Sequence, residues 1–540
     1  MKFGSVAVEE ALGCVLAHTV KLGHFNLKKG KVLSQLDIDS LRAEKIPGVI
    51  VARLEASDVP EDEAARRLST AMSGSDAAAQ EAFTGRANIY AEQAGVLLVD
   101  QKRLREINHL HESLTIATLP TFARVGRRDM LATVKIIPFA TPRVVLEKAL
   151  GIIDDTPLVS VAAFKPLRVG LIITTLPQTK DSIVTKSETA IRERVNTLGG
   201  TLVQVLVCAH AQDVLAREVH VLKDVDLILL FGASAIVDRA DIVPAALVEA
   251  GGVVRHVGMP VDPGNLLMLG ALGGTPVIGV PSCARSPKVN GFDWVLERIM
   301  AGIDVNPSDL MDMGAGGLLA EIKSRPQPRE MQSSVMKAPR IGAVILAAGA
   351  STRMGSNKLL ANFNGQAMVA HTVAQVKKSS ILDVLVITGH QAEEVRSALE
   401  NSGVSFAHNP KFTEGLSTSL RVGVTKMRDE YDAILVCLGD MPLIDPKDID
   451  RMIAAFNPLE HRSIVVPVHG RRFGNPVLWG EEHFAALISC EGDRGARGLL
   501  ESLKNDVVEI DVTNQGVLLD ADTPEALAIL KAISFEVGNQ

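Results

Sequence analysis

The stretch that most constrains this chain is residues 342–360, which read G-A-V-I-L-A-A-G-A-S-T-R-M-G-S-N-K-L-L. Its apolar run, residues 343–346, has the length of a buried strand and breaks into small residues and glycine. Small residues let backbone N–H groups approach an anion closely, and Arg353 and Lys358 add two cations. The pattern predicts a strand followed by a phosphate-binding turn. The alternative is an ordinary strand-to-helix loop with surface cations.

The whole string resembles the L-A-A-G-x-S-x-R-M-G-x-N-K-L-L signature of nucleotidyltransferases of the molybdenum cofactor cytidylyltransferase type. The resemblance implies a Rossmann-like α/β domain over residues 341–540, with a mostly parallel sheet and helices on both faces. It also implies that the phosphates of CTP bind to residues 347–358. The residues it implies for nucleotide binding are Leu346, Ala347, Ala348, Gly349, Ser351, Arg353, Lys358, Gly389, Ser417, Ser419 and Asp440.

A second motif, A-I-L-V-C-L-G-D-M-P at residues 433–442, predicts a buried strand that ends in an acid. A carboxylate at the carboxyl end of a parallel strand lies over the ligand crevice, so Asp440 can hold Mg²⁺ or Mn²⁺ against nucleotide phosphates. Capping of the next turn is the alternative. The related family has acids in register with Asp440 near its end, which implies a further metal contact from Asp520 or Asp522. The catalytic residues predicted are Arg353, Lys358 and Asp440, and the metal ligands are Asp440, Asp520 and Asp522.

The choice of nucleotide is predicted from Ala348. Guanylyltransferases that resemble this chain usually read L-A-G-G, with glycine where Ala348 stands. A methyl group there narrows the space for the base and favours a pyrimidine, although one methyl group accounts for only part of the selection. CTP is therefore the expected donor, and GTP is the alternative.

Composition excludes some other classes of protein. A chain of 540 residues with 47% hydrophobic and 22% charged residues is expected to form two to four globular domains. Its net charge of −7 disfavours a nucleic-acid binder. Glu9 and Glu10 stand where a signal peptide would have its apolar region, and no run of 18 apolar residues occurs. We therefore expect a cytoplasmic protein without a membrane span. The cysteines have no C-x-x-C spacing and predict neither a zinc site nor disulfides.

Residues 1–165 are expected to form a mixed α+β segment. Residues 10–17 (E-A-L-G-C-V-L-A) and 28–41 resemble the opening of the molybdopterin molybdotransferase family, which has an E-A-L-G-R-V-L-A helix and a later K-x-G pattern. Periodicity predicts a strand and then a helix begun near Asp37 within residues 31–42. The other predicted elements are a helix within residues 59–80, a loop, helical turn and strand over residues 85–100, and a strand over residues 132–142. His109 and His111 are expected to face solvent.

Residues 166–322 show the α/β alternation of a parallel sheet, with predicted strands at 167–175, 201–208, 225–232 and 275–281 and a helix at 187–198. The order resembles the molybdopterin-binding domain of the molybdotransferase and molybdopterin adenylyltransferase families. The glycine-rich loop of those families is reduced here to Gly232, and Asp238 and Asp241 both match its acid. Residues 470–479 and 491–500 add arginines and glycines in loops. The molybdopterin-binding residues predicted are Thr175, Asp181, Ser234, Asp238, Asn475, Arg494 and Arg497.

A polar, proline-bearing stretch, residues 323–340, is predicted to be a linker between these regions. The resemblance as a whole implies transfer of CMP from CTP to molybdopterin, with or without molybdenum, to give the cytosine dinucleotide and pyrophosphate. The N-terminal half would bind molybdopterin and assist molybdenum insertion. Molybdoenzymes or their dedicated chaperones are the implied partners. The alternatives are a nucleotidyltransferase for another phosphorylated acceptor and a non-catalytic cofactor carrier.

Overall fold

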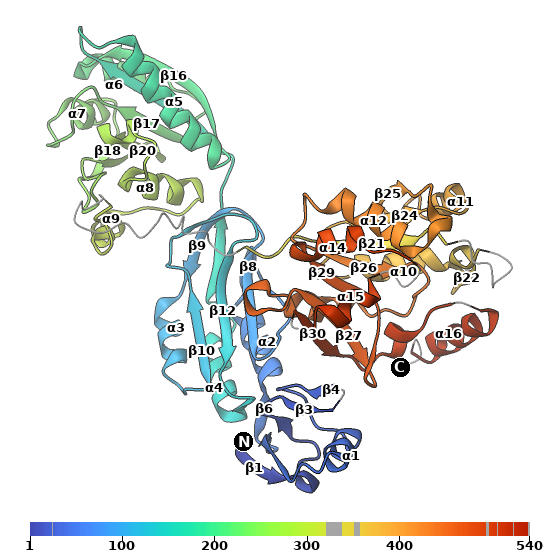
Figure 1. Cartoon of the computed structure of the whole chain (residues 1–540). Helices are drawn as coiled ribbons and strands as arrows, with labels where there is room; N and C mark the ends of the chain where they lie inside the picture. The colour runs from blue at the N-terminus through green and yellow to red at the C-terminus, as the bar shows by residue number, and fades with distance from the viewer. Residues whose placement is uncertain are drawn as a thin grey trace.

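The computed structural model describes residues 1–23, 25–319, 337–349, 357–492, 496–504, 506–521 and 523–537. Its buried hydrophobic residues form separate clusters, and four groups of elements surround them (Figure 1). We name these groups the N-terminal unit (residues 1–53), the second unit (58–163), the third unit (168–314) and the C-terminal unit (the described residues from 337 to 537). None of the helices in the described residues is long and apolar enough to cross a membrane.

The N-terminal unit is a small antiparallel sheet with one helix. Its elements are β1 (Lys2–Ala7), η1 (Val8–Glu10), β2 (Val15–Leu16), β3 (Val20–Leu22), β4 (Phe25–Leu27), α1 (Gln35–Ala43) and β5 (Gly48–Arg53). The sheet has the order β1-β5-β2, and β3 pairs only with β4. The helix predicted near Asp37 is confirmed, because Ser34 caps it, but the strand expected before it is reduced to one bridge between Val15 and Val32. Residues 10–17, which resemble a helix of the molybdotransferase family, form the end of η1, a turn and β2.

The second unit contains three sheets and three helices. Its elements are β6 (Asp58–Pro60), α2 (Glu61–Met72), β7 (Ala77–Ala79), β8 (Arg86–Ala91), β9 (Gly95–Val99), α3 (Gln101–Asn108), β10 (Leu114–Thr118), β11 (Arg124–Val125), β12 (Met130–Ile136), β13 (Ala140–Pro142), α4 (Arg143–Ile153) and β14 (Val159–Ala163). The sheet orders are β10-β12-β8-β7, β11-β9-β14 and β13-β6. The helical turn predicted within residues 85–100 is wrong, because β8 and β9 occupy this stretch. Alternation in β8 buries Ala87 and Ile89, and pairing with β7 and β12 favours the strand over a helical turn. His109 and His111 are exposed, as predicted.

The third unit is an α/β sheet in the order β16-β15-β17-β20-β19-β18. Its elements are β15 (Arg168–Thr175), α5 (Asp181–Thr197), β16 (Thr201–Ala209), α6 (Gln212–Val221), β17 (Leu227–Phe231), α7 (Ile242–Glu249), β18 (Val253–Val257), β19 (Met268–Leu272), β20 (Thr275–Val280), η2 (Ser282–Arg285), α8 (Gly291–Met300), α9 (Pro307–Met311) and η3 (Asp312–Gly314). The four predicted strands are confirmed and run parallel, whereas β18 and β19 form an antiparallel edge that the sequence analysis missed. The predicted helix begins six residues earlier, at Asp181.

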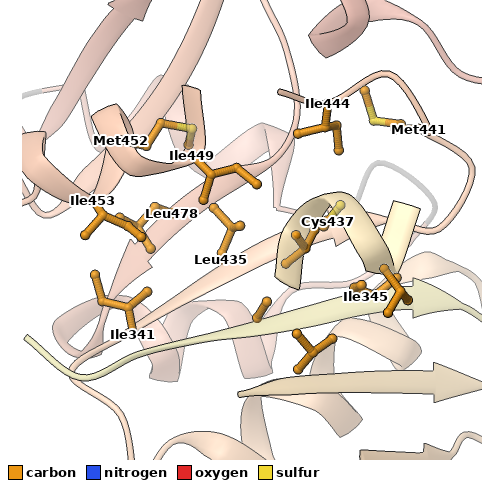
Figure 2. Packing of buried hydrophobic residues seen from close by; sticks show 14 of the residues in the cluster. Ile341, Ile345, Leu435, Cys437, Met441, Ile444, Ile449, Met452, Ile453 and Leu478 are labelled. Carbon is orange, nitrogen blue, oxygen red and sulfur yellow. The ribbon is translucent and has the colours of Figure 1, made fainter. Parts of the chain in front are cut away.

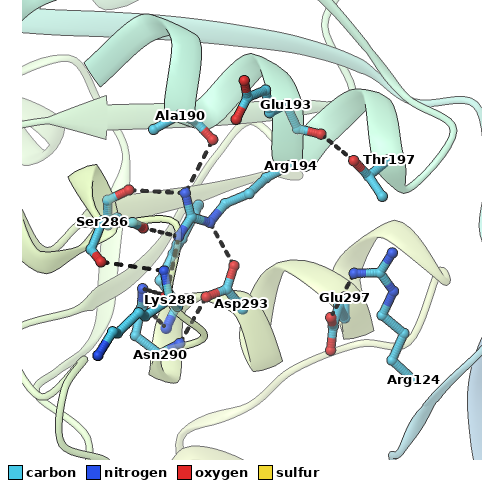
Figure 3. Close-up of polar contacts among 12 residues, drawn as sticks. Arg124, Ala190, Glu193, Arg194, Thr197, Ser286, Lys288, Asn290, Asp293 and Glu297 are labelled. Carbon is cyan, nitrogen blue, oxygen red and sulfur yellow. Dashed lines mark hydrogen bonds and ion pairs between the residues drawn. The ribbon is translucent and has the colours of Figure 1, made fainter. Parts of the chain in front are cut away.

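One arginine joins two helices, α5 and α8, that cover the same face of the third unit (Figure 3). Arg194 of α5 pairs with Asp293 of α8 at 2.6 Å and donates to the carbonyl oxygens of Ala284 (3.0 Å) and Ser286 (2.6 Å). The loop after β20 is therefore fixed by a helix of the same unit. Figure 3 also shows Glu297 of α8 facing Arg124 of the second unit, at 3.7 Å.

The C-terminal unit is a mixed sheet in the order β25-β24-β21-β26-β29-β27-β28, with β30 pairing with β27. Its strands are β21 (Ile341–Ala347), β22 (Asn362–Phe363), β23 (Gln366–Ala367), β24 (Val384–Thr388), β25 (Ser405–His408), β26 (Ala433–Leu438), β27 (Ile464–His469), β28 (Arg472–Phe473), β29 (Val477–Gly480) and β30 (Val507–Asp511). Its α-helices are α10 (Met368–Lys377), α11 (Ala392–Ala398), α12 (Leu416–Met427), α13 (Pro446–Ala455), α14 (Phe484–Ser489), α15 (Arg497–Ser502) and α16 (Pro524–Val537). Short 3₁₀ turns are η4 (Lys358–Leu360), η5 (Phe412–Glu414), η6 (Pro458–Glu460), η7 (Glu481–His483) and η8 (Gln515–Leu518).

The central strand β21 is buried on both faces, which explains its unbroken apolar sequence. Ile341 and Ile345 pack under α13 with Leu435 and Leu478 (Figure 2). The alternate residues of β21 pack against α12 on the opposite face. The strand therefore carries its carboxyl end, and the turn after it, to the middle of one edge of the sheet.

Candidate active site

The turn after β21 lies between the ends of two neighbouring strands. The N–H of His390, after β24, donates to the carbonyl oxygen of Ala348 (3.1 Å), and the N–H of Gly439, after β26, donates to that of Leu346 (3.0 Å). Leu346, Ala347 and Ala348 are buried, whereas Gly349 is exposed. Three parallel strands, β24, β21 and β26, thus end together. Ser351 and Arg353 lie outside the described residues.

Gly389 is required by the close approach of these strand ends. A Cβ at this position would lie 2.7 Å from Cβ of Ala348 and 2.8 Å from Cβ of Phe412. Both distances are shorter than carbon atoms tolerate, so a side chain at Gly389 would displace the turn. The methyl group of Ala348 therefore packs toward position 389, and it fits there because residue 389 is a glycine.

Lys358 and Asp440 form the charged centre of the site. Their side chains make an ion pair between Nζ and Oδ2, and the Asp440 side chain is 7% exposed. Lys358 begins η4, whose cap is Asn357, and Asp440 stands two residues beyond β26. Two of the three predicted catalytic residues are thus brought together from separate parts of the chain. An ion pair in a largely buried place interacts strongly with any further charge, because water screens it little.

Asn357 has a second property that the sequence analysis missed. Its Oδ1 accepts from the N–H of Leu359 at 3.1 Å, but its Nδ2 is buried and has no hydrogen-bond partner among the described residues. A buried donor without a partner is costly, and a ligand oxygen would satisfy it. Asn357 directly precedes Lys358, so this donor belongs to the segment that supplies the cation of the ion pair.

The loop that carries Asp440 is supported by α10. Thr372 Oγ1 donates to the carbonyl oxygen of Gly439 at 3.1 Å, and His371 Nδ1 lies 3.0 Å from that of Pro442. A carbonyl only accepts, so His371 carries its proton on Nδ1. Burial lowers the pKa of His371, which keeps the ring neutral. These two residues hold both sides of Asp440, and their place at the start of a helix gave no sequence signal for this.

The metal residues predicted around Asp440 are only partly described. Asp520 is exposed and follows the 3₁₀ turn η8. Asn514 caps this turn and donates to the carbonyl oxygen of Leu443 at 2.8 Å. The residues before Asp520 thus lie beside the Asp440 loop. Asp522 lies outside the described residues.

No group of three or more His, Cys, Asp or Glu side chains suited to a metal ion occurs within the described ranges. Mg²⁺ differs from zinc in this respect, because one or two carboxylates, substrate phosphates and water complete its six ligands. Asp440, an oxygen donor at the carboxyl end of a strand, fits that chemistry.

The residues at the start of α12 are joined by Asn409, which is 1% exposed. Its Nδ2 lies 2.8 Å from Thr418 Oγ1 and 2.9 Å from Ser419 Oγ, and its own N–H donates to the carbonyl oxygen of Thr388. Ser417 and Ser419, both predicted to contact the nucleotide, are buried. Asn409 follows directly after β25. Asp440 was predicted because it follows the carboxyl end of a parallel strand, and the same reasoning would have identified Asn409.

Asn475 contacts η8, the 3₁₀ turn whose cap Asn514 donates to Leu443 in the loop after Asp440. Its N–H donates to the carbonyl oxygen of Val517 at 2.9 Å, and it is half-buried between β28 and β29. Two other molybdopterin residues were predicted in this unit. Arg494 lies outside the described residues, and Arg497 begins α15, with its side chain outside the description.

The third unit holds a second cluster at the carboxyl ends of β15, β16 and β17. Thr174 Oγ1 accepts from the N–H of Ala233 (2.9 Å) and lies 2.8 Å from His210 Nδ1. His210 Nε2 lies 2.7 Å from Oγ of Ser234, which is exposed. Burial lowers the pKa of His210 against the opposing charge of Asp241, so this chain of groups is neutral at pH 7. The winding of the sheet reverses after β16, so its switch point lies between β15 and β17, which is where such sheets bind ligands.

Thr175 and Asp181 lie on the other face of this sheet, in an open groove of about 550 Å³ lined also by Thr179, Thr185 and Val207. The structure therefore separates these two predicted residues from Ser234. Asp238 accepts from the N–H of Ala240, and Asp241 accepts from the N–H groups of Val237 and Asp238. Both acids thus hold the loop after β17 in shape. Thr174 and His210 were missed, although each lies at the end of a predicted strand.

Comparisons with known proteins bear on the C-terminal unit and the N-terminal unit. Residues 343–507 match the family described as the MobA-like NTP transferase domain, and residues 5–53 match a domain of unknown function (DUF8806). The chain is similar to the molybdenum cofactor cytidylyltransferase of Escherichia coli (strain K12), with 27% identity over 198 residues, which are 36% of this chain and 98% of that protein.

Two further similarities cover 26% and 36% of the chain. The bifunctional protein GlmU of Clostridioides difficile (strain 630) is 35% identical over 144 residues, 26% of this chain and only 29% of that protein. A solved complex of Rv0371C with manganese from Mycobacterium tuberculosis H37Rv has 25% sequence identity and a TM-score of 0.32, and the match covers 36% of this chain and 98% of that one. The family match shows that residues 343–507 form a nucleotidyltransferase-type domain.

Proposed function

We propose that the C-terminal unit transfers a cytidylyl group from CTP to the terminal phosphate of molybdopterin, which releases pyrophosphate. The observation that carries the proposal is the Lys358–Asp440 pair beside the turn after β21. The similarity to a molybdenum cofactor cytidylyltransferase over 98% of that protein's length supports the choice of reaction.

The protein's part in this reaction is to position the reactants and to neutralise charge. The phosphate of the acceptor attacks the α-phosphorus of CTP in line, and pyrophosphate leaves without a covalent enzyme intermediate. Lys358 places an ammonium group against the phosphates, and Arg353 is proposed to do the same. The unpaired Nδ2 of Asn357 offers a further hydrogen bond to a phosphate oxygen.

A divalent cation, Mg²⁺ or Mn²⁺, would supply neutralisation of the phosphate charge, and Asp440 with Asp520 or Asp522 would hold it. His371 and Thr372 keep the Asp440 loop in place through its two carbonyl oxygens. This support matters because a carboxylate displaced by about 1 Å loses much of its effect on the rate.

The acceptor is proposed to bind on the Asn475 side of the Asp440 loop, with Arg494 and Arg497. The third unit is proposed as a second molybdopterin site, in which Ser234 and His210 offer neutral hydrogen-bonding groups to a polar ligand. A ligand passed between two sites on one chain benefits from the raised effective concentration. Molybdoenzymes or their chaperones would then receive the product.

One observation favours a second candidate acceptor. GlmU, similar over 144 residues, is a different protein from the cytidylyltransferase, so the nucleotide part of the site is compatible with another phosphorylated acceptor or with GTP. The neutral cluster of the third unit has no role in that case. A non-catalytic carrier is disfavoured by the buried Lys358–Asp440 pair, because a carrier needs no such charge.

The experiment that tests the proposal incubates the purified chain with Mg²⁺, molybdenum-loaded molybdopterin and either CTP or GTP. We expect pyrophosphate and the cytosine dinucleotide in equal amounts with CTP and much less product with GTP. Pyrophosphate released only with sugar phosphates as acceptors would support the second candidate. Absence of pyrophosphate with every acceptor would overturn both.

A further inference from the structure

Arg471 of the C-terminal unit reaches into the N-terminal unit. It stands in the turn between β27 and β28, and its Nη2 lies 2.8 Å from Asp37 Oδ1 and 3.0 Å from both Leu36 O and Ser40 Oγ, all on α1. Its guanidinium group also lies 4.7 Å from the centre of the Phe25 ring on β4. One side chain thus contacts two elements of the N-terminal unit.

Asp37 is built to receive this arginine. It is fully buried, and its Oδ2 accepts from the N–H (3.0 Å) and Oγ (2.7 Å) of Ser34, which completes the capping box of α1. Its Oδ1 faces Arg471, with Lys31 at 3.4 Å. Burial alone would raise the pKa of Asp37, but the hydrogen bonds from Ser34 and Arg471 and the charge of Lys31 hold it below its ordinary value. The carboxylate is therefore charged at neutral pH.

The backbone at Arg471 shows that the contact matters for this turn. Gly470 and Arg471 have φ angles of 56° and 67°, the left-handed values that a two-residue hairpin turn requires. Glycine, asparagine and aspartate adopt this conformation readily, whereas an arginine does so at a cost. The contacts with Asp37 and Phe25 offset that cost only while the N-terminal unit is in place.

A second contact lies on the neighbouring strand. Lys28, directly after β4, places its Nζ 3.1 Å from the carbonyl oxygen of Val507 and 3.2 Å from Glu509 Oε1, both on β30. Because β30 pairs with β27 in parallel, the N-terminal unit contacts two adjacent strands of the transferase sheet.

The other end of the same hairpin leads to the proposed acceptor site. After β28 the chain passes through Gly474, whose N–H donates to the carbonyl oxygen of Pro467 at 2.8 Å, to Asn475. The next strand, β29, pairs with β26, the strand that precedes Asp440. The turn held by Asp37 and the residue proposed to contact the acceptor are thus the two ends of one short segment.

We propose that the N-terminal unit positions the acceptor side of the transferase site, and that Arg471 is the positioning residue that couples the two units. The proposal rests on the proposed function, since Asn475 is an acceptor contact only there. It assigns a role to the segment that matches a domain of unknown function: this unit acts on acceptor binding and leaves nucleotide binding to the ends of β21 and β26.

The test compares the full chain with Arg471→Gly, which removes the side chain but keeps a residue suited to a φ of 67°. We expect KM for molybdopterin to rise about tenfold, while KM for CTP changes less than about twofold. Arg471→Lys keeps the positive charge but loses the planar guanidinium group. Its KM for molybdopterin should therefore lie between that of the parent chain and that of Arg471→Gly. The control is Arg42→Ala. It also removes one arginine, but this arginine lies on α1 and pairs with Glu9 and Asp39 of its own unit.

Amide hydrogen exchange provides a readout that needs no substrate. Arg471→Gly should speed exchange both in residues 464–473 and in residues 35–43, whereas Arg42→Ala should not change residues 464–473. An active parent whose Arg471→Gly variant keeps both KM values would overturn the proposal. If the parent makes no dinucleotide, the proposed function fails separately. In that case hydrogen exchange alone tests whether Arg471 couples the two units. Unchanged exchange in residues 35–43 of Arg471→Gly would overturn this coupling.

Discussion

The sheets of the C-terminal unit and the third unit follow the same plan but end in different chemistry. Each has a central parallel strand, β21 or β15, with parallel neighbours on both sides. At the carboxyl ends of the first sheet lies a buried ion pair, Lys358 with Asp440. At those of the second lies a neutral chain of hydrogen bonds from Thr174 through His210 to Ser234.

The difference teaches that such a sheet decides where a ligand binds but not what happens to it. In the first sheet, the ammonium group can pair with phosphate groups and the carboxylate with a metal ion, because each can replace its present partner with a ligand charge in a weakly screened place. A neutral imidazole between two hydroxyl groups can only donate and accept hydrogen bonds to a bound molecule unless a proton moves. The proposed function accordingly gives transfer to the first sheet and ligand binding to the second.

The largest effect is expected from neutralising the charged site. Asp440→Asn should lower kcat by roughly 10²-fold or more, because a charge is lost where the transition state requires a metal ion. The matched control is Asp445→Asn, since Asp445 caps α13 through the N–H of Lys447 and asparagine caps equally well. Steady-state kinetics and a thermal melt measure both variants. Near-normal turnover in Asp440→Asn would remove the contrast between the two sheets.

A smaller effect is expected on the choice of nucleotide. Ala348→Gly removes the methyl group that packs toward position 389, so the ratio of kcat/KM for CTP over GTP should fall about tenfold without inverting. Competition assays with both nucleotides measure this ratio. Equal kcat/KM for CTP and GTP in the parent chain would refute the assignment of CTP, and an unchanged ratio in the variant would move specificity to other residues.

The neutral site should respond in binding alone. Ser234→Ala removes one hydrogen-bonding group, so one class of molybdopterin sites should weaken about fivefold, as expected for a single hydrogen bond, while kcat stays unchanged. Equilibrium dialysis with labelled molybdopterin measures the affinity. Ser308→Ala, an exposed serine in the same unit, is the control. A loss of kcat in Ser234→Ala comparable to that of Asp440→Asn would mean that the second sheet takes part in catalysis.

The smallest effect on activity is expected from a buried charge outside both sites. Burial raises the pKa of Glu297 to about 7, against the lowering effect of Arg124, and the side chain is 13% exposed. The folded chain thus holds this proton more tightly than the unfolded chain, and rising pH from about 4.5 to 7 favours unfolding. Glu297→Gln should stabilise the protein by on the order of 2 kcal/mol at pH 8 and hardly at pH 4.

Thermal melts of Glu297→Gln and the parent at several pH values measure this difference, and turnover should be the same in both. An equal melting difference at pH 4 and pH 8 would show that Glu297 does not titrate as described. A loss of turnover would show that a buried charge far from the site affects catalysis, so that the loss in Asp440→Asn would not be specific to the site.

The success of the strand predictions in both sheets has a local cause. The runs that became β15, β17, β21 and β26 are apolar without interruption, because helices cover both faces of these strands. The strands that were missed include β8, β18, β19, β28 and β29, which lie in stretches whose polar residues and glycines suggest loops. Their pairing partners, not their own sequences, hold them extended.

The candidate site residues also divide into those that the local sequence predicts and those that depend on tertiary contacts. Asp440 was predictable from its position after a buried strand, and His210 and Asn409 occupy equivalent positions that were overlooked. The roles of Asn357 and His371 had no signal, because an unpaired amide and a carbonyl contact exist only after the chain has folded.

The sequence by itself determined the buried parallel strands, the small residues of the turn after β21 and the residue types needed for phosphate chemistry, since these depend on local pattern and on covalent structure. Only the tertiary structure decided that Lys358 meets Asp440, that Thr175 and Ser234 lie on opposite faces of one sheet, and that Arg471 meets Asp37. Contacts between distant residues depend on how whole elements pack, and no local preference encodes which surfaces meet.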